Sequence, residues 1–259
     1  MLRRGEDLVV GQPAHAWVSG QLARAWGNAA FPAPAPREPF CLAAEQHDVG
    51  WADADLAPLL DDDGLPRSFL AYPRAEHVAI WRGAARRLLA QSRYAALLVS
   101  LHGTSLYERI DPAAYPPEVA AAIRDYVAGE HALQASLSAG LDAAEVDRNR
   151  RLLLALDRFS LALCHGRATT LEELGAPIAV APAPAPEGGG GGAARDDHAV
   201  PPGTATECWT VAPWPFAAEQ VVVGCEARRL AGPFPDAGAA RAALAAAPWV
   251  PLRWELRAG

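Results

Sequence analysis

The residue types best suited to chemistry are histidines and aspartates that recur through the first part of the chain. They are His15, His47, Asp48, His77, His102 and Asp157. A neutral imidazole nitrogen and a carboxylate oxygen are both common ligands of divalent metal ions. Burying such groups without partners costs several kcal/mol of folding free energy, and a shared metal ion offsets that cost. We therefore predict a metal site, provided that these side chains face the interior of the fold.

The adjacent His47 and Asp48 anchor this prediction. They end an apolar stretch in which Phe40, Ala44 and His47 have the i, i+4, i+7 spacing of one helix face. Gly50 is predicted to stop this helix, because glycine is common directly after a helix C-terminus. The pair is therefore expected to point into the core from the end of a helix.

The remaining candidates are predicted to lie on the apolar faces of further helices. Helices are expected over residues 9–26, 74–92, 94–101, 116–139 and 142–165. Helical spacing puts His15, His77 and Asp157 among apolar residues, and His102 directly follows another apolar segment. The chain contains no lysine, so Asp157 needs a partner of another kind.

The composition is that of an ordinary globular protein, with 51% hydrophobic and 20% charged residues. A formal net charge of −7 and the lack of a basic block argue against nucleic acid as a partner. No apolar run reaches the ~18–20 residues of a membrane span, and the start lacks a signal-peptide core. We therefore expect a cytoplasmic protein with no membrane partner. The spacing of the cysteines fits neither a zinc nor a redox motif, so we expect reduced thiols at Cys41, Cys164, Cys208 and Cys225.

Three regions of the chain differ in composition. Residues 1–174 carry the helical periodicity, residues 175–203 form a Pro-, Ala- and Gly-rich flexible linker or loop, and residues 204–259 contain short strand-like runs. We predict that the last region is a small antiparallel sheet packed on the helical domain. The predicted fold class is mainly α, a helical bundle with a small C-terminal antiparallel β element.

The order His, His-Asp, His, His, Asp on a helical scaffold resembles the HD-domain metalloenzyme superfamily. The mononuclear core of that superfamily matches His15, His47, Asp48 and Asp157, and the two extra histidines of its dinuclear members match His77 and His102. The resemblance covers about residues 9–165 and implies an HD-domain-like helical bundle. Over its full length the chain also resembles an uncharacterised bacterial family.

The resemblance implies a dinuclear metalloenzyme, and we favour a phosphohydrolase that acts on a small phosphoester or nucleotide. The cofactor would be two divalent or mixed-valent metal ions, with iron preferred and manganese, nickel or zinc as alternatives. Asp48 would be the catalytic residue that bridges both metals, and a metal-bridged hydroxide would attack phosphorus. Arg67, Arg93 and Trp51 are expected to bind the small-molecule substrate, the arginines by neutralising phosphate.

Two alternatives stay open. Superfamily hydrolases often have a lysine after the HD-x-G turn, where this chain has Trp51. That difference and the short spacing between the histidines favour a mixed-valent di-iron oxygenase, which would cleave a small hydroxylated substrate with O2. The second alternative is a non-catalytic helical binding module with a structural or lost metal site. Its partner surface would then be the tryptophan-rich C-terminal region.

Overall fold

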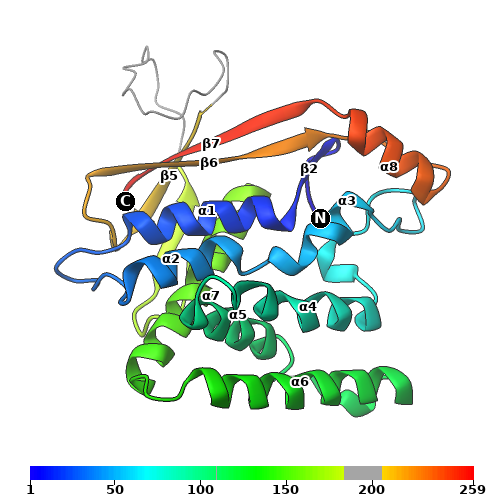
Figure 1. The fold of residues 1–259 in the computed structure, drawn as a ribbon. Helices are drawn as coiled ribbons and strands as arrows, with labels where there is room; N and C mark the ends of the chain where they lie inside the picture. Colours follow the sequence, from blue (N-terminus) through cyan, green and yellow to red (C-terminus); the bar gives the residue numbers. More distant parts are fainter. Residues whose placement is uncertain (109, 184–205) are drawn as a thin grey trace, which may run out of the picture.

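The computed structural model describes residues 1–108, 110–183 and 206–259. Helices are layered beneath a long sheet, with α1 directly under the strands and α6 farthest from them (Figure 1). Most of the predicted linker, from residue 184 to residue 203, lies outside the described residues. Within the described ranges, no helix is both long enough and apolar enough to cross a bilayer.

The helices come from most of the chain up to residue 165, with one more near the C-terminus. They are α1 (Gln12–Ala25), α2 (Arg37–Gln46), α3 (Ala52–Leu56), α4 (Arg74–Leu88), α5 (Arg93–Ser105), α6 (Pro117–Leu137), α7 (Ala143–His165) and α8 (Ala237–Ala246). Short 3-10 turns occupy η1 (Val49–Trp51), η2 (Phe69–Ala71) and η3 (Pro112–Ala114). Helix α7 begins where the Asp142 carboxylate accepts two backbone N–H bonds, and ends at Gly166 with φ 68°. These are the capping residues that such termini favour.

Within the described residues, seven strands form one sheet. The strands are β1 (Leu2–Arg4), β2 (Leu8–Val10), β3 (Thr169–Leu171), β4 (Ile178–Pro182), β5 (Thr206–Ala212), β6 (Gln220–Arg229) and β7 (Trp249–Ala258). Their spatial order is β1-β2-β6-β7-β5-β4-β3. Neighbours are antiparallel except β5 and β7, which are parallel over residues 206–211 and 253–258.

The prediction of a mainly α fold with a small C-terminal antiparallel element is wrong, because the chain forms a mixed α/β fold. The sheet takes β1 and β2 from the N-terminus, and β2 pairs with β6 through Leu8 opposite Arg229. Strand β4 lies in what was predicted to be linker. Strands of three to five residues are too short to show a period of two, so pairing with distant segments defines them.

Helix α1 connects the sheet to the rest of the helices. The Gln21 side chain donates to the backbone carbonyl of Gly224 at 2.7 Å and accepts from its N–H at 3.0 Å. This pair of bonds satisfies both backbone groups of one β6 residue. On the same side of the sheet, Trp209 and Trp254 are almost fully buried in the main core. Helix α1 is thereby held between the sheet and α2, and its buried residues include His15.

Candidate metal centre

Four helices bring five of the six predicted ligands together. His15 lies in α1, His47 directly follows α2, His102 lies in α5 and Asp157 lies in α7. Asp48 precedes the 3-10 turn η1. The three histidine side chains and Asp48 are at most 4% exposed, so the group is removed from bulk water. Residues 142 positions apart in sequence therefore share one small volume, since 157 − 15 = 142.

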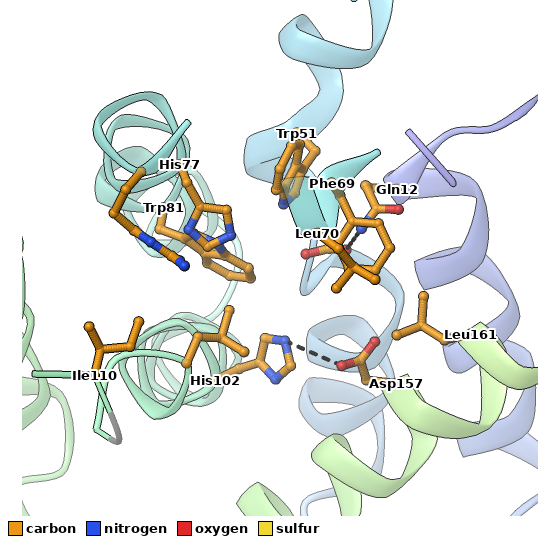
Figure 2. Close-up of a pocket in the computed structure, with 13 residues that line it drawn as sticks. Gln12, Trp51, Phe69, Leu70, His77, Trp81, His102, Ile110, Asp157 and Leu161 are labelled. Carbon is orange, nitrogen blue, oxygen red and sulfur yellow. Dashed lines mark hydrogen bonds and ion pairs between the residues drawn. The ribbon is translucent and has the colours of Figure 1, made fainter. Parts of the chain in front are cut away.

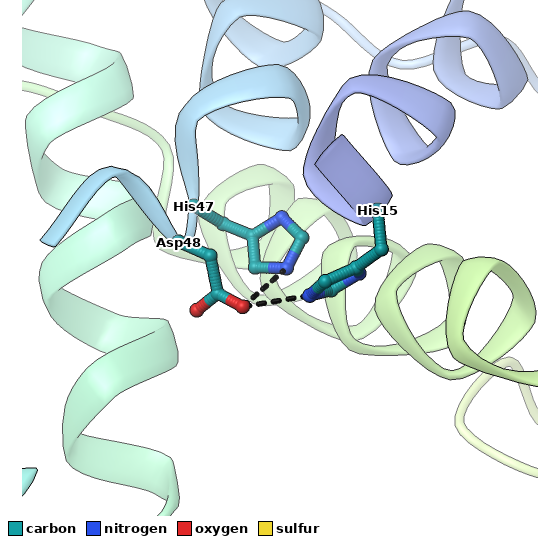
Figure 3. Close-up of side chains that lie close together, drawn as sticks. All are labelled: His15, His47 and Asp48. Atoms are coloured by element: carbon teal, nitrogen blue, oxygen red, sulfur yellow. Dashed lines mark hydrogen bonds and ion pairs between the residues drawn. The ribbon is translucent and has the colours of Figure 1, made fainter. Parts of the chain in front are cut away.

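His15, His47 and Asp48 form the first potential ligand group (Figure 3). The Nε2 atom of His15 lies 2.7 Å from Oδ2 of Asp48, and Nε2 of His47 lies 3.9 Å from the same oxygen. All three potential ligand atoms are within 4.8 Å of one another. A cation between them would contact two imidazoles and one carboxylate, which is a donor set that zinc, iron and manganese accept.

His47, His102 and Asp157 form the second group, so His47 belongs to both. The two carboxylate oxygens of Asp157 face different histidines. Oδ1 lies 3.4 Å from Nε2 of His47, and Oδ2 lies 3.8 Å from Nε2 of His102 (Figure 2). Asp157 therefore lies between two imidazoles that come from α2 and α5.

Hydrogen bonds from outside the groups orient the imidazoles. Nδ1 of His47 donates to the carbonyl of Ala44 at 2.8 Å, which leaves Nε2 facing the carboxylates. Nδ1 of His15 lies 2.9 Å from the Ser160 hydroxyl, which itself donates to the backbone carbonyl of Asp157. In the tautomer in which Ser160 accepts from Nδ1 of His15, the Nε2 lone pair of His15 faces Asp48 and is available to a metal ion.

A buried nitrogen atom without a hydrogen-bond partner also fits a metal site. Among the described residues, Nε2 of His47 and Nδ1 of His102 are such atoms, but the His102 nitrogen that faces Asp157 is Nε2. Buried polar atoms are normally paired. A metal ion at Nε2 of His47 would give this atom a partner, and the two nearby carboxylates would balance the charge. The residues present therefore fit a bound cation.

The pKa shifts describe the electrostatics of the metal-free cluster. Burial alone would lower the pKa of His47, but Asp48 and Asp157 outweigh it and raise that pKa to about 9. Burial would raise the pKa values of the two carboxyls, yet contacts with His47 hold both below their usual range. Burial lowers the pKa of His102 to about 4. At neutral pH the cluster thus holds two carboxylates, a protonated His47 and a neutral His102.

His77 lies near this cluster but belongs to neither group. Its Nδ1 lies 2.5 Å from the Tyr107 hydroxyl, and its Nε2 accepts from the Trp81 indole N–H at 3.3 Å. Burial and the charge of Arg74 lower the pKa of His77 to about 4, so it is neutral at pH 7. Both of its nitrogens are already engaged. A metal ion at His77 would have to displace the indole of Trp81.

A cavity of about 220 Å³ opens onto the cluster. Asp48, His77, His102 and Asp157 line it, and the remaining wall is largely aromatic and aliphatic. His77, His102 and Asp157 are shown with part of this wall in Figure 2. Trp51, predicted to contact substrate, lines this cavity. A few polar groups in a largely apolar wall are a common arrangement for small-molecule sites.

The two arginines predicted to bind substrate lie elsewhere. Arg67 donates to the carbonyl of Leu60 at 2.9 Å, and Arg93 donates to the carbonyl of Ala139 at 3.3 Å. Neither lines the cavity, whereas Arg74 does. The position of Arg74 near the cavity could have been predicted from the sequence. Residues three apart on a helix share a face, and His77 follows Arg74 by three positions.

Sequence reasoning also missed Gln12 and Ser160. The Gln12 amide donates to Oδ2 of Asp48 at 3.2 Å, and Ser160 holds His15. Both residues act on a ligand from outside the cluster. Polar residues of these types are common on helices, so their spacing alone carries no signal.

Gly50 has a different role from the predicted helix stop. Helix α2 ends at Gln46, and His47 after it is still right-handed helical. A Cβ atom at Gly50 would lie 2.6 Å from the backbone carbonyl oxygen of Ile80 in α4. The absence of a side chain lets α4, which carries His77, pass close to the turn that carries Asp48.

Replacing Gly50 with alanine should therefore destabilise the protein. Overpacking against a backbone atom typically costs about 1–3 kcal/mol, and the expected loss in unfolding free energy is of that order. Urea denaturation followed by circular dichroism measures it. Gly83→Ala is the matched control, because a Cβ at Gly83 meets nothing within 4 Å and alanine favours the helix. Equal stability of both variants would contradict the close approach at Gly50.

Taken together, these features describe a mixed α/β protein with a buried His/Asp cluster at a small cavity. The chain belongs to the family described as "Protein of unknown function (DUF3891)", which matches residues 2–232. No curated protein and no solved structure matches the chain. That description names no activity, so any function has to be inferred from the cluster.

Proposed function

We propose that the protein is a metal-dependent hydrolase of the HD type that acts on a small phosphoester. The observation that carries this proposal is the pairing of two carboxylates, Asp48 buried and Asp157 partly buried, with three buried imidazoles at the wall of a cavity. In the proposed site, His15, His47, Asp48 and Asp157 hold one metal ion. The likeness to HD enzymes is based on the order of these residues along the chain alone.

Such a metal ion would supply Lewis-acid chemistry, because it lowers the pKa of water and polarises a phosphoryl oxygen. The chain's own residues would prepare the site. Ala44 and Ser160 orient two imidazoles through their Nδ1 atoms, as outer-shell partners do in known metal sites. The amide of Gln12 orients Asp48, the proposed catalytic carboxylate, and the apolar cavity wall restricts the access of water.

A second metal position would involve His102 and His77. His102 supports this idea, because it is neutral at pH 7 and its Nε2 faces Asp157. His77 supports it less, because the indole of Trp81 donates to its Nε2. We therefore propose that the first metal binds to the cluster before the second, and that Trp81 releases His77 when the second metal binds.

A di-iron oxygenase is the second candidate. The supporting observation is the cavity wall, in which Trp51, Phe69 and Trp81 lie beside aliphatic side chains. Hydrolases of highly charged phosphate esters use several cationic groups to stabilise the developing charge. Among the described residues, Arg74 is the one arginine that lines this cavity.

Metal content and reactivity test both proposals together. The protein is purified without oxygen and its metals are quantified, with the Asp48→Ala variant alongside. The hydrolase proposal expects at least one Mn, Ni, Zn or Fe per chain, lost in the variant, and metal-dependent release of phosphate from small phosphoesters. Two irons per chain and substrate-dependent uptake of O2 would favour the oxygenase. A protein that takes up no metal would contradict both proposals and favour a binding module.

Ser160→Ala should weaken metal binding without unfolding the protein. Its hydroxyl accepts from Nδ1 of His15, so its loss frees the imidazole to rotate and to lose the required tautomer. Loss of such outer-shell partners lowers metal affinity by roughly 10–100-fold. Competition with a chromophoric chelator measures the change. Ser138→Ala removes a hydroxyl-to-backbone bond at the C-terminal end of α6 and should leave the affinity unchanged.

A further inference from the structure

Arg74 is the cation that the cavity offers to a ligand. It is the first residue of α4, it is half-buried, and its side chain lines the cavity one helical turn before His77. Its guanidinium carbon lies 5.9 Å from the ring centre of Tyr107 and 5.7 Å from that of Tyr115. Stacking of this kind holds a guanidinium in place, and with one N–H group directed at the Tyr107 hydroxyl, the others stay available to a ligand.

No acidic side chain neutralises Arg74 in the part of the chain that the structure describes. None of the ion pairs within 4.0 Å involves it, whereas Arg86 and Arg87 of the same helix each have a carboxylate partner. A half-buried, oriented and unpaired guanidinium is well suited to a bound anion. The carboxylates of the cluster are engaged by histidines, so the cavity has a cationic part and a separate metal-binding part.

The rest of the wall restricts what the anion is attached to. Phe69, Trp81, Ile110 and Leu161 also line the cavity, as does Leu70, which is 76% exposed. A cavity volume of about 220 Å³ lies below the ~300–1,000 Å³ that is common for ligand pockets. A nucleotide would extend out of this cavity, whereas a molecule with a short aliphatic body fits inside.

We propose that Arg74 binds the oxyanion head of a small substrate that has a single charged group and a short apolar body. The head is a phosphate, phosphonate or carboxylate, which a guanidinium can bind through two parallel hydrogen bonds. The proposed function locates the chemistry of this substrate at the His/Asp cluster, and the present inference rests on it in that respect. Arg74 would then determine specificity by selecting the anion and setting its distance from the cluster.

Calorimetric titration of the full chain, loaded with its native metal, tests this proposal. The probes are propylphosphonate, butyrate and 1-butanol, which share a short apolar body and differ in charge. At least one of the two oxyanions should bind, 1-butanol should not, and the stronger oxyanion identifies the head group. Binding of 1-butanol as tight as that of both anions, or no binding of either anion, would overturn the proposal.

Arg74→Gln should weaken oxyanion binding by at least about tenfold, the loss expected for a charge-assisted hydrogen bond. Arg74→Lys keeps the charge without the planar guanidinium, so its oxyanion affinity should lie between those of the wild type and Arg74→Gln. Arg124→Gln, an exposed position on α6, is the charge-matched control and should bind like the wild type. Unchanged binding by both Arg74 variants, with metal content equal to that of the wild type, would overturn the proposal.

The same titrations separate this inference from the proposed function. They are repeated on protein treated with a chelator, because Arg74 is not one of the proposed metal ligands. Arg74-dependent anion binding by a protein that never takes up metal would support the anion site and contradict the metalloenzyme. Full metal loading with anion binding that does not depend on Arg74 would contradict the anion site alone.

Discussion

The Asp157→Ala variant should purify without its stoichiometric metal. Asp157 is the residue whose two oxygens face two different histidines, His47 at 3.4 Å and His102 at 3.8 Å. Its removal takes away a ligand and also one of the two charges that balance a cation in a buried site. We expect metal affinity to fall by more than the roughly 10–100-fold that outer-shell partners contribute. Elemental analysis and chelator competition measure the loss.

Two companion variants make this result specific. Asp157→Asn keeps the shape and one oxygen ligand, so it should retain more metal than alanine but less than the wild type. Asp147→Ala removes a half-exposed carboxylate from the same helix and should retain full metal content. Exposed ion pairs contribute only about 0–1 kcal/mol, so its effect on stability should be small. Full metal content and affinity in Asp157→Ala would show that the proposed cluster is not the metal site.

The long helices were predictable from the sequence, because periodicity and capping residues act locally. Asp142 and Glu145 predict the start of α7, and the structure begins this helix at Ala143. The sheet was not predictable in the same way. Strand β2 has three residues, and what makes it a strand is its pairing with β1 and with β6, more than 200 positions later. Such long-range pairing leaves no pattern in a short segment.

The candidate site likewise has features that local sequence patterns predict and features that depend on packing. Helical faces and the order of residues predict an inward group that contains His15, His47 and Asp157. The i, i+4 spacing brings Trp81 near His77. It does not predict that the Trp81 indole N–H donates to Nε2 of His77, because that bond depends on the rotamers of both side chains. The sequence patterns also favoured Arg67 and Arg93, whose guanidinium groups bond to nearby backbone carbonyls instead. Arginine is common on protein surfaces, so position relative to a cavity has to come from the fold.

The helices and the sheet share the task of positioning the cluster. Helix α1 carries His15, and the bonds of Gln21 to Gly224 attach this helix to β6. The sheet therefore positions one proposed ligand although it contributes none itself.

Metal affinity should rise about tenfold for each pH unit between pH 6.5 and pH 9. In the metal-free protein, Asp48 and Asp157 overcome the effect of burial and raise the pKa of His47 to about 9. A metal ion needs the neutral imidazole, so binding below pH 9 must release the His47 proton. In the folded, metal-free protein His47 holds this proton up to about pH 9, well above its ordinary pKa of about 6.5. Above pH 9 His47 is neutral, so protons no longer compete with the metal ion for its Nε2. His102, with its pKa lowered to about 4, adds no dependence in this range.

The measurement is chelator competition at pH 6.5, 7.25 and 8, corrected for protonation of the chelator. Calorimetry in two buffers of different ionisation enthalpy should show release of about one proton per metal ion at pH 7. The stability of the metal-free protein should change in the opposite direction. Because the pKa of His47 is raised in the folded state, protonated His47 stabilises the fold fully below pH 6.5, and this contribution is lost as the pH rises through 9. Metal-free protein should therefore lose thermal stability over this range, whereas metal-loaded protein should not. An affinity that is constant from pH 6.5 to 8 would mean that His47 is neutral in the metal-free protein and that the carboxylates do not control it.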